Sequence, residues 1–141
     1  MSSQSKFEII FTFVGTDSVV IGEIIRFQAP QTFEALQDKT REKGFYTVRS
    51  RANIGREKSY WMVLVDLQRG GEKNEYKESQ IGDIVYCPRQ DAIYLIYDTP
   101  TLTLPVYYLG KIKSGIESFQ NMRNGTMVKI EFKEILEKYN P

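Results

Sequence analysis

The chain has 141 residues, 41% of them apolar and 26% charged, with a formal net charge of +1, which is typical of one globular domain. The near-neutral charge argues against nucleic acid or membrane as a partner. The absence of histidine excludes histidine-dependent catalysis and histidine metal sites. Because Cys87 is the single cysteine, a structural zinc site and an intramolecular disulfide are also excluded. No apolar run reaches the roughly 18 residues of a membrane-spanning helix, and the polar N-terminus has no signal-peptide core, so we expect a cytoplasmic protein.

Alternating apolar residues predict two strands at the start of the chain. In residues 7–13, every second position from Phe7 is phenylalanine or isoleucine, which is the period of a half-buried strand. Residues 18–27 continue the alternation, with Val19, Ile21, Ile25 and Phe27 on one face. The short polar segment Gly-Thr-Asp between the two runs is typical of a hairpin turn, so we expect an antiparallel pair.

Residues 29–44 break this alternation and predict one short helix. Pro30 stands at its start, Thr32 is the expected N-cap and Gly44 the expected end. The positions that recur at helical spacing are Phe33, Leu36 and Thr40. Such a narrow apolar stripe predicts a helix that lies over an open end or a face of a sheet.

The rest of the chain again predicts strands. Residues 45–53 alternate and residues 59–66 are almost wholly apolar, whereas residues 68–80 are polar and residues 98–105 form a loop with two prolines. Further strands are expected at 84–87, 93–96, 106–112 and 126–132, with a turn or short helix at 113–125 and one or two helical turns after residue 132.

A set of about eight short strands with one or two helices indicates a mainly β barrel or sandwich. Several strands are apolar on both faces, which favours a closed barrel because closure leaves no exposed edge. We predict a closed eight-stranded β-barrel capped by one or two short helices. It would form a single domain over residues 1–141, with a core at about 7–132 and a C-terminal extension at 133–141.

Residues 81–100 and 104–112 resemble a small prokaryotic group of proteins called cyclophilin-like. The group typically has a Gly-Asp-x-x-Tyr-Trp-Pro segment, a strand that ends in Thr-Pro, and a Pro-Val-x-x-x-Gly strand. The matching positions here are Gly82, Asp83, Tyr86, Pro88, Tyr97, Thr99, Pro100, Pro105, Val106 and Gly110. The likeness extends from about Phe7 to Phe132 and implies a cyclophilin-like barrel. Cys87 and Arg89 depart from the group's pattern, which implies a divergent member whose pocket has changed shape.

The candidate ligand site lies at a mouth of this barrel. Arg49 and Arg51 share a strand face because alternate residues point the same way, and arginine offers a planar donor fork to an anion or a peptide carbonyl. The sequence leaves open whether the two arginines face the mouth or solvent. Tyrosine at a strand end supplies apolar area and a hydroxyl. The full candidate set is Arg49, Arg51, Asn53, Glu57, Tyr86, Pro88 and Tyr97.

These residues indicate a module that binds a peptide or a small ligand, with no catalytic residue, metal or cofactor assigned. One alternative is a peptidyl-prolyl isomerase-like enzyme, the activity of the enzymes that give the fold its name, with Arg49 or Arg51 as donor to the prolyl nitrogen. The histidine and the Phe-x-x-Gln-Gly-Gly segment of those enzymes are missing, which argues against it. The other alternative is a protein-interaction subunit, and the oligomeric state is left open.

Three single residues have simpler expected roles. Trp61, within an apolar strand, is expected in the core. Asp83 begins a strand after a glycine, where its carboxylate is expected to bond nearby backbone N–H groups. Cys87 is expected to be a buried, inert thiol.

Overall fold

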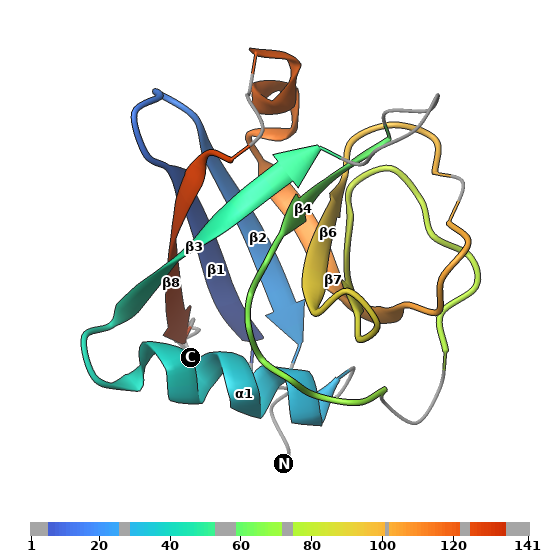
Figure 1. Cartoon of the computed structure of the whole chain (residues 1–141), viewed down its shortest axis with the longest axis horizontal. Coiled ribbons are helices and arrows are strands. Elements are labelled where there is room, and N and C mark those ends of the chain that lie inside the picture. Colours follow the sequence, from blue (N-terminus) through green and yellow to red (C-terminus); the bar gives the residue numbers. More distant parts are fainter. Residues whose placement is uncertain are drawn as a thin grey trace, which may run out of the picture.

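The structure is a computed structural model of the chain, and it describes residues 6–25, 29–52, 59–71, 75–100, 102–121 and 125–134. Across this described part, eight antiparallel strands close into a barrel with one α-helix and one short 3-10 helix (Figure 1). The predicted fold class is confirmed. The strands are β1 (Lys6–Phe13), β2 (Val19–Ile25), β3 (Phe45–Ala52), β4 (Tyr60–Val63), β5 (Asp83–Cys87), β6 (Ala92–Ile96), β7 (Tyr107–Ser114) and β8 (Met127–Glu134), and the helices are α1 (Pro30–Arg41) and η2 (Ile116–Asn121).

The order of the strands around the barrel is β1-β2-β7-β5-β6-β4-β3-β8, and pairing of β8 with β1 closes it. The predicted first hairpin is β1 and β2, with Phe11 opposite Val20. β5 and β6 are also neighbours, and the turn from Pro88 to Asp91 links them. Strands that are distant in the chain, such as β2 and β7, are also neighbours in the sheet.

The inside of the barrel holds the main core. Ile9, Phe11 and Phe13 of β1 are fully buried there together with Val128 and Ile130 of β8. Trp61 of β4 lies in the same core, as predicted. One continuous core inside a closed sheet explains why the alternating pattern of β1 and β8 is so clear.

For β2, the face selected from the sequence is not the buried one. The structure buries Val20 and Ile24, whereas Val19 is exposed, Ile21 and Ile25 are only partly buried, and Phe27 lies outside the described residues. Both faces of β2 are apolar, so periodicity alone does not decide which faces inward. The antiparallel register with β1, which sets Val20 opposite the inward Phe11, makes that decision.

A second apolar layer lies outside the barrel, over β4, β5 and β6. We call it the outer apolar layer, and its buried members are Met62, Val85, Cys87, Ala92, Tyr94, Ile96 and Val106. It explains why β5 and β6 are buried at every position. Cys87 is a fully buried free thiol in this layer, as expected.

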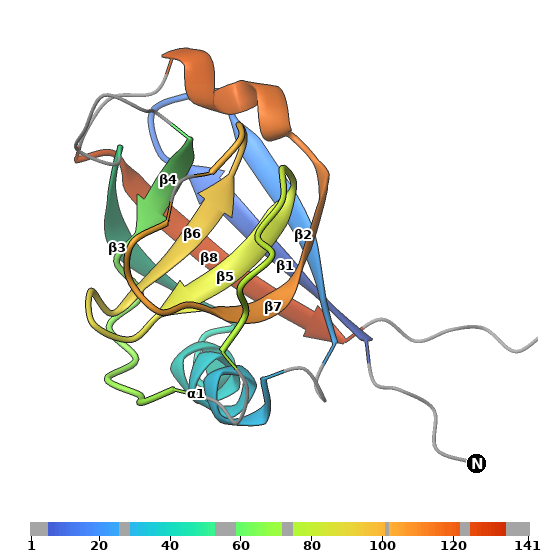
Figure 2. The ribbon, with the colours of Figure 1, turned by 90° about the vertical axis from the view of Figure 1, so that its right-hand side faces the viewer.

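Each mouth of the barrel is covered by one helix, with α1 at the bottom and η2 at the top of Figures 1 and 2. Phe33 of α1 packs edge-on against Phe7, with ring centroids 4.4 Å apart. Phe119 is the buried anchor of η2 and stacks on Tyr97, with ring centroids 5.1 Å apart. No helix in the described part of the chain is long and apolar enough to cross a membrane.

Two local expectations at element ends are wrong. The helix α1 begins at Pro30 with Ala29 as N-cap, so Thr32 lies inside the first turn and is buried. Proline is favoured in the first helical turn because its fixed φ suits a helix and its missing N–H has no partner there, and this moves the helix start ahead of Thr32. β8 continues to Glu134, which pairs with Phe7, so residues 133 and 134 are strand and not helix. Residues 135–141 lie outside the described residues.

Candidate functional site

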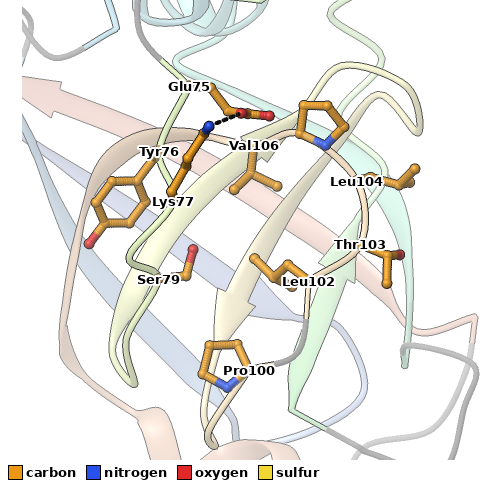
Figure 3. Close-up of a pocket in the computed structure, with 10 residues that line it drawn as sticks. Glu75, Tyr76, Lys77, Ser79, Pro100, Leu102, Thr103, Leu104 and Val106 are labelled. Carbon is orange, nitrogen blue, oxygen red and sulfur yellow. Dashed lines mark ion pairs between the residues drawn. The ribbon is translucent and has the colours of Figure 1, made fainter.

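A cleft of about 470 Å³ lies outside the barrel, between two segments without regular secondary structure. One wall is part of the long connection before β5, and the other is part of the connection between β6 and β7 (Figure 3). We call it the loop cleft, and its lining residues are Glu75, Tyr76, Lys77, Ser79, Pro100, Leu102, Thr103, Leu104, Pro105 and Val106. Its size is within the ~300–1,000 Å³ that is usual for ligand sites.

The apolar part of the loop cleft is built on the outer apolar layer. Leu102, Leu104 and Tyr76 are partly buried against that layer, and Val106 belongs to it. The leucines alternate with threonine between Pro100 and Pro105, so one side of this short segment is apolar. The barrel therefore supplies a fixed base, and the two segments supply walls that still present apolar surface to solvent.

The two walls share one backbone hydrogen bond among the described residues, in which the N–H of Tyr76 donates to the carbonyl oxygen of Val106 at 2.9 Å. Within the described part of the chain, no backbone hydrogen bond involves residues 77–79 or residues 102–104. Their N–H and C=O groups are left to solvent or to a ligand, because every backbone polar group needs a partner. The loop cleft thus combines apolar side chains with unpaired backbone donors and acceptors.

Asp83 anchors one wall of the loop cleft to the barrel. Its carboxylate is fully buried at the start of β5. One oxygen accepts from the Tyr76 hydroxyl and from the Gln80 N–H, each at 2.8 Å, and the other accepts from Lys111 Nζ at 2.9 Å. The expected bond between Asp83 and a nearby backbone N–H is confirmed. The two further donors make Asp83 the connection between the wall, β5 and β7.

The electrostatics of this anchor follow from its burial. Desolvation raises the pKa of Tyr76, and its hydrogen bond to the Asp83 carboxylate raises that pKa further. The pKa of Lys111 is also raised, chiefly by its hydrogen bond to Asp83. Tyr76 is therefore a neutral donor and Lys111 a charged donor at neutral pH, which is the state in which both can bond a carboxylate.

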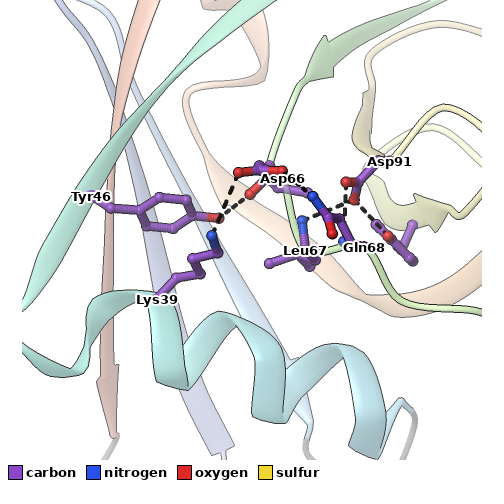
Figure 4. Close-up of polar contacts among 8 residues, drawn as sticks. Lys39, Tyr46, Asp66, Leu67, Gln68 and Asp91 are labelled. Carbon is purple, nitrogen blue, oxygen red and sulfur yellow. Dashed lines mark hydrogen bonds and ion pairs between the residues drawn. The ribbon is translucent and has the colours of Figure 1, made fainter.

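A second polar cluster lies at the barrel mouth that α1 covers (Figure 4). One Asp91 oxygen accepts from the Tyr86 hydroxyl at 2.7 Å and from the Leu67 N–H at 2.9 Å, and the other accepts from the Gln68 N–H at 3.0 Å. Nearby, the Tyr46 hydroxyl donates to the Val65 carbonyl at 2.9 Å. Asp91 thus holds the segment after β4 against the turn between β5 and β6.

The backbone at this mouth is strained. Asp66, Gln68 and Asp91 all have positive φ, at 52°, 54° and 49°. Residues other than glycine adopt this left-handed backbone conformation at an energetic cost, so contacts with the surrounding structure must stabilise it. The three bonds to the Asp91 carboxylate span these positions and provide that support. We interpret this cluster as structural.

Replacing Tyr86 with phenylalanine tests this interpretation. The variant Tyr86→Phe removes a hydroxyl that donates to a carboxylate while the ring stays buried, and we expect a loss of about 1–2 kcal/mol in the free energy of unfolding. Urea denaturation measures it. The matched control is Tyr97→Phe, because the Tyr97 hydroxyl has no hydrogen-bond partner among the described residues. Equal losses in the two variants would contradict a supporting role for the Tyr86–Asp91 bond.

The structure separates the residues of the candidate set that was chosen from the sequence. Arg49 and Arg51 are exposed on the outside of β3, whereas Tyr46 and Val48 of the same strand face the core. Neither guanidinium forms an ion pair within the described part of the chain. The orientation that the sequence left open is therefore outward, to solvent.

The tyrosines of the candidate set lie at opposite mouths. Tyr86 bonds Asp91 at the mouth that α1 covers, close to Pro88, whereas Tyr97 follows β6 and stacks on Phe119 at the other mouth. The five residues of β6 separate the two ends by roughly 17 Å. Asn53 and Glu57 lie outside the described residues. None of the described members of the set lines the loop cleft.

Reasoning from the sequence missed the loop cleft. A signal was present in residues 100–105, where leucine and threonine alternate between two prolines. This is the pattern of a short strand whose ends are prevented from pairing, because proline has no N–H. The polar segment that forms the opposite wall carried no such signal, since its role depends on the buried contact with Asp83.

The overall architecture has a counterpart among solved structures. A hypothetical protein from Archaeoglobus fulgidus, known from its solution structure, matches this chain with a TM-score of 0.67 and 20% sequence identity, over 92% of this chain and 97% of that chain. No protein-family model and no curated protein matches the sequence. At this level of identity the likeness concerns the fold, so the two chains share the barrel architecture that carries the loop cleft in this protein.

Proposed function

We propose that this protein is a binding module whose ligand, a peptide or a small molecule, occupies the loop cleft. The cleft itself carries the proposal, because apolar side chains and unpaired backbone groups line a space of about 470 Å³. Ligand sites generally combine apolar walls with a few polar groups that set orientation. Leu102 and Leu104 supply the apolar wall, and Lys77 and Ser79 supply the polar groups.

The rim of the loop cleft adds charge of both signs. Lys77 Nζ lies 3.8 Å from a carboxylate oxygen of Glu75, and the lysine side chain is 80% exposed. Such a loose surface pair contributes little to stability and can exchange partners. The polar end of a ligand therefore has either a cation or an anion to contact at this rim.

We also infer that the chain is a divergent cyclophilin-like protein. The closed eight-stranded barrel supports the inference, as do the positions of the resembling motifs. Asp83 begins β5, Pro88 follows it, and Gly110 lies where β7 passes close to β2. At Gly110 the fold itself restricts the residue type, because a Cβ there would overlap the Glu23 backbone.

Filling the loop cleft tests the proposed function. The variant Ser79→Trp adds a large ring to a lining position, and we expect it to weaken ligand binding at least tenfold because the ring occupies the ligand's space. Ligand-observed NMR of the full chain against a mixture of small molecules and short peptides identifies the binders and measures their affinity.

The control is Ser114→Trp, which places the same ring at an exposed position at the end of β7, away from the lining residues. Binders that lose affinity with Ser79→Trp and keep it with Ser114→Trp support the loop cleft as the site. Binders unaffected by Ser79→Trp, or no binder at all with the folded wild-type chain, would overturn the proposal.

A further inference from the structure

We propose that the barrel mouth covered by η2 is a second ligand site, which takes a small, uncharged aromatic molecule that carries a hydrogen-bond acceptor. This site is separate from the loop cleft, which lies outside the barrel. The inference depends on three features of the mouth, which are a buried donor without a partner, the aromatic side chains around it and the weak attachment of η2 to the barrel.

The buried donor is the indole N–H of Trp61, the single tryptophan of the chain. Trp61 is 2% exposed, and in the described part of the chain its Nε1 is the one buried side-chain nitrogen or oxygen atom that has no hydrogen-bond partner. Burying an unpaired donor costs free energy that a purely apolar side chain at the same position would not cost. A ligand that brings an acceptor to Nε1 removes this cost, so it binds more tightly than an apolar molecule of the same shape.

The side chains around this donor are aromatic. The ring centroid of Phe119, on η2, lies 6.1 Å from that of Trp61, 5.1 Å from that of Tyr97 and 6.0 Å from that of Phe13. The Trp61 and Phe119 rings are 27° from parallel. Because an indole N–H lies in the plane of its own ring, it does not point at the face of the Phe119 ring. Phe119 therefore fills the mouth without being a partner for the donor.

Phe119 can leave this position without breaking backbone hydrogen bonds to the barrel. It is the one buried side chain among those described for η2, in which Ile116 is half-buried and Glu117 is exposed. Within the described residues, no backbone hydrogen bond ties residues 116–121 to a barrel strand. A 3-10 helix of this length also has poor internal hydrogen-bond geometry. The cover of this mouth is thus held mainly by one ring, which an aromatic ligand of similar size can replace.

The polar groups of the molecule indicate an uncharged ligand. Asp83 is the one buried charged residue in the described part of the chain, and it bonds Tyr76 and Lys111 beside the loop cleft. A charged ligand would therefore lose its hydration at the η2 mouth without a buried counter-charge. The Tyr97 hydroxyl has no hydrogen-bond partner among the described residues, and Tyr97 is only partly buried. It offers a second polar contact to a ligand whose acceptor faces Trp61.

The test uses the full chain with acetophenone and larger uncharged aryl ketones of one or two rings. Each ketone is paired with the alkene that has CH2 in place of the carbonyl oxygen, which keeps the shape and removes the acceptor. Proton–nitrogen correlation NMR observes the Trp61 indole N–H as a single signal, because the chain has one tryptophan. We expect ketones to bind and to move this signal downfield, and their paired alkenes to bind about fivefold more weakly or worse.

Three variants locate the site. Phe119→Ala removes the ring that covers the mouth, and we expect it to bind the ketones roughly tenfold more tightly or better, because no ring has to be displaced. Phe119→Leu replaces it if the alanine variant does not fold. The matched control is Phe33→Ala, which removes the same ring from α1 at the other mouth and should leave the affinity unchanged. In Trp61→Phe, which lacks the N–H, each ketone and its alkene should bind equally.

Ketones that bind the wild-type chain no more tightly than their alkenes, or that leave the Trp61 signal unchanged at saturation, would overturn the proposal. Failure of every ketone to bind both the wild-type chain and the folded Phe119 variant would do the same. Equal gains in the Phe119 and Phe33 variants would indicate general loosening and not a site at this mouth. A ligand of the loop cleft leaves the Trp61 signal in place and loses affinity in Ser79→Trp, so either proposal can fail while the other stands.

Discussion

Replacing Gly110 with alanine is expected to destabilise the barrel by about 3 kcal/mol or more, or to prevent folding altogether. Gly110 lies in β7, opposite Ile24 of β2 and Ile84 of β5. An alanine Cβ at this position would overlap the backbone oxygen of Glu23. A backbone atom in the middle of two ladders cannot move aside without breaking hydrogen bonds, so the strands would have to separate.

Urea denaturation followed by circular dichroism measures this effect. Gly22→Ala is the matched control because it adds the same methyl group to the adjacent strand, where it meets mainly the end of the Ile84 side chain. A side-chain end can rotate away, so we expect a loss of about 1–2 kcal/mol there. If Gly110→Ala were as stable as Gly22→Ala, close approach of β7 to β2 would not be the reason for glycine at this position.

Replacing Asp83 with alanine is expected to have the second largest effect, on both stability and binding. The change removes the acceptor of the Tyr76 hydroxyl, the Gln80 N–H and the Lys111 ammonium. Lys111 is 56% exposed and can return to water, so the main cost comes from the other two donors. We expect a loss of about 2–4 kcal/mol in the free energy of unfolding.

Asp83→Ala should also release one wall of the loop cleft, because the bonds to Tyr76 and Gln80 hold that wall to the barrel. Ligand affinity is expected to fall at least tenfold, as measured by titration of a cleft ligand under conditions in which the variant is still folded. The control is Asp98→Ala, since Asp98 is exposed and, among the described residues, its carboxylate accepts only from the neighbouring Thr99 N–H. If the Asp83→Ala variant bound the ligand with the same affinity as the Asp98→Ala variant, Asp83 would not be the anchor of the cleft wall.

The pH dependence of this anchor has a definite sign. The folded-state pKa of Lys111 is raised above the ordinary value of 10.5, chiefly by its hydrogen bond to Asp83. The stabilisation from a raised lysine pKa is fully present below 10.5 and is lost as the pH rises through the folded-state pKa. The Lys111 contribution is therefore constant across neutral pH, and stability measured from pH 6 to pH 9 should show no transition caused by titration of Lys111.

Hydrophobic period was the most informative property of the sequence. It predicted the strands of the barrel and the single α-helix, because inward residues of a closed sheet must alternate with outward ones. Where both faces are apolar the same reasoning fails, as for β2, in which Val20 and not Val19 is buried. It fails also at Thr32, where the local preference for an N-cap residue is overridden by Pro30 at the helix start.

The sequence by itself determined the fold class, the order of the elements and the burial of Trp61, Cys87 and the β1 core, because each depends on local period and residue type. Only the tertiary structure decided which residues form the candidate site. Tyr76 lies near Val106 and Lys111 because the strand order sets β5 beside β7, and the buried Asp83 carboxylate then holds a distant loop to this face. Contacts between segments so far apart depend on strand order and register, which local patterns do not contain.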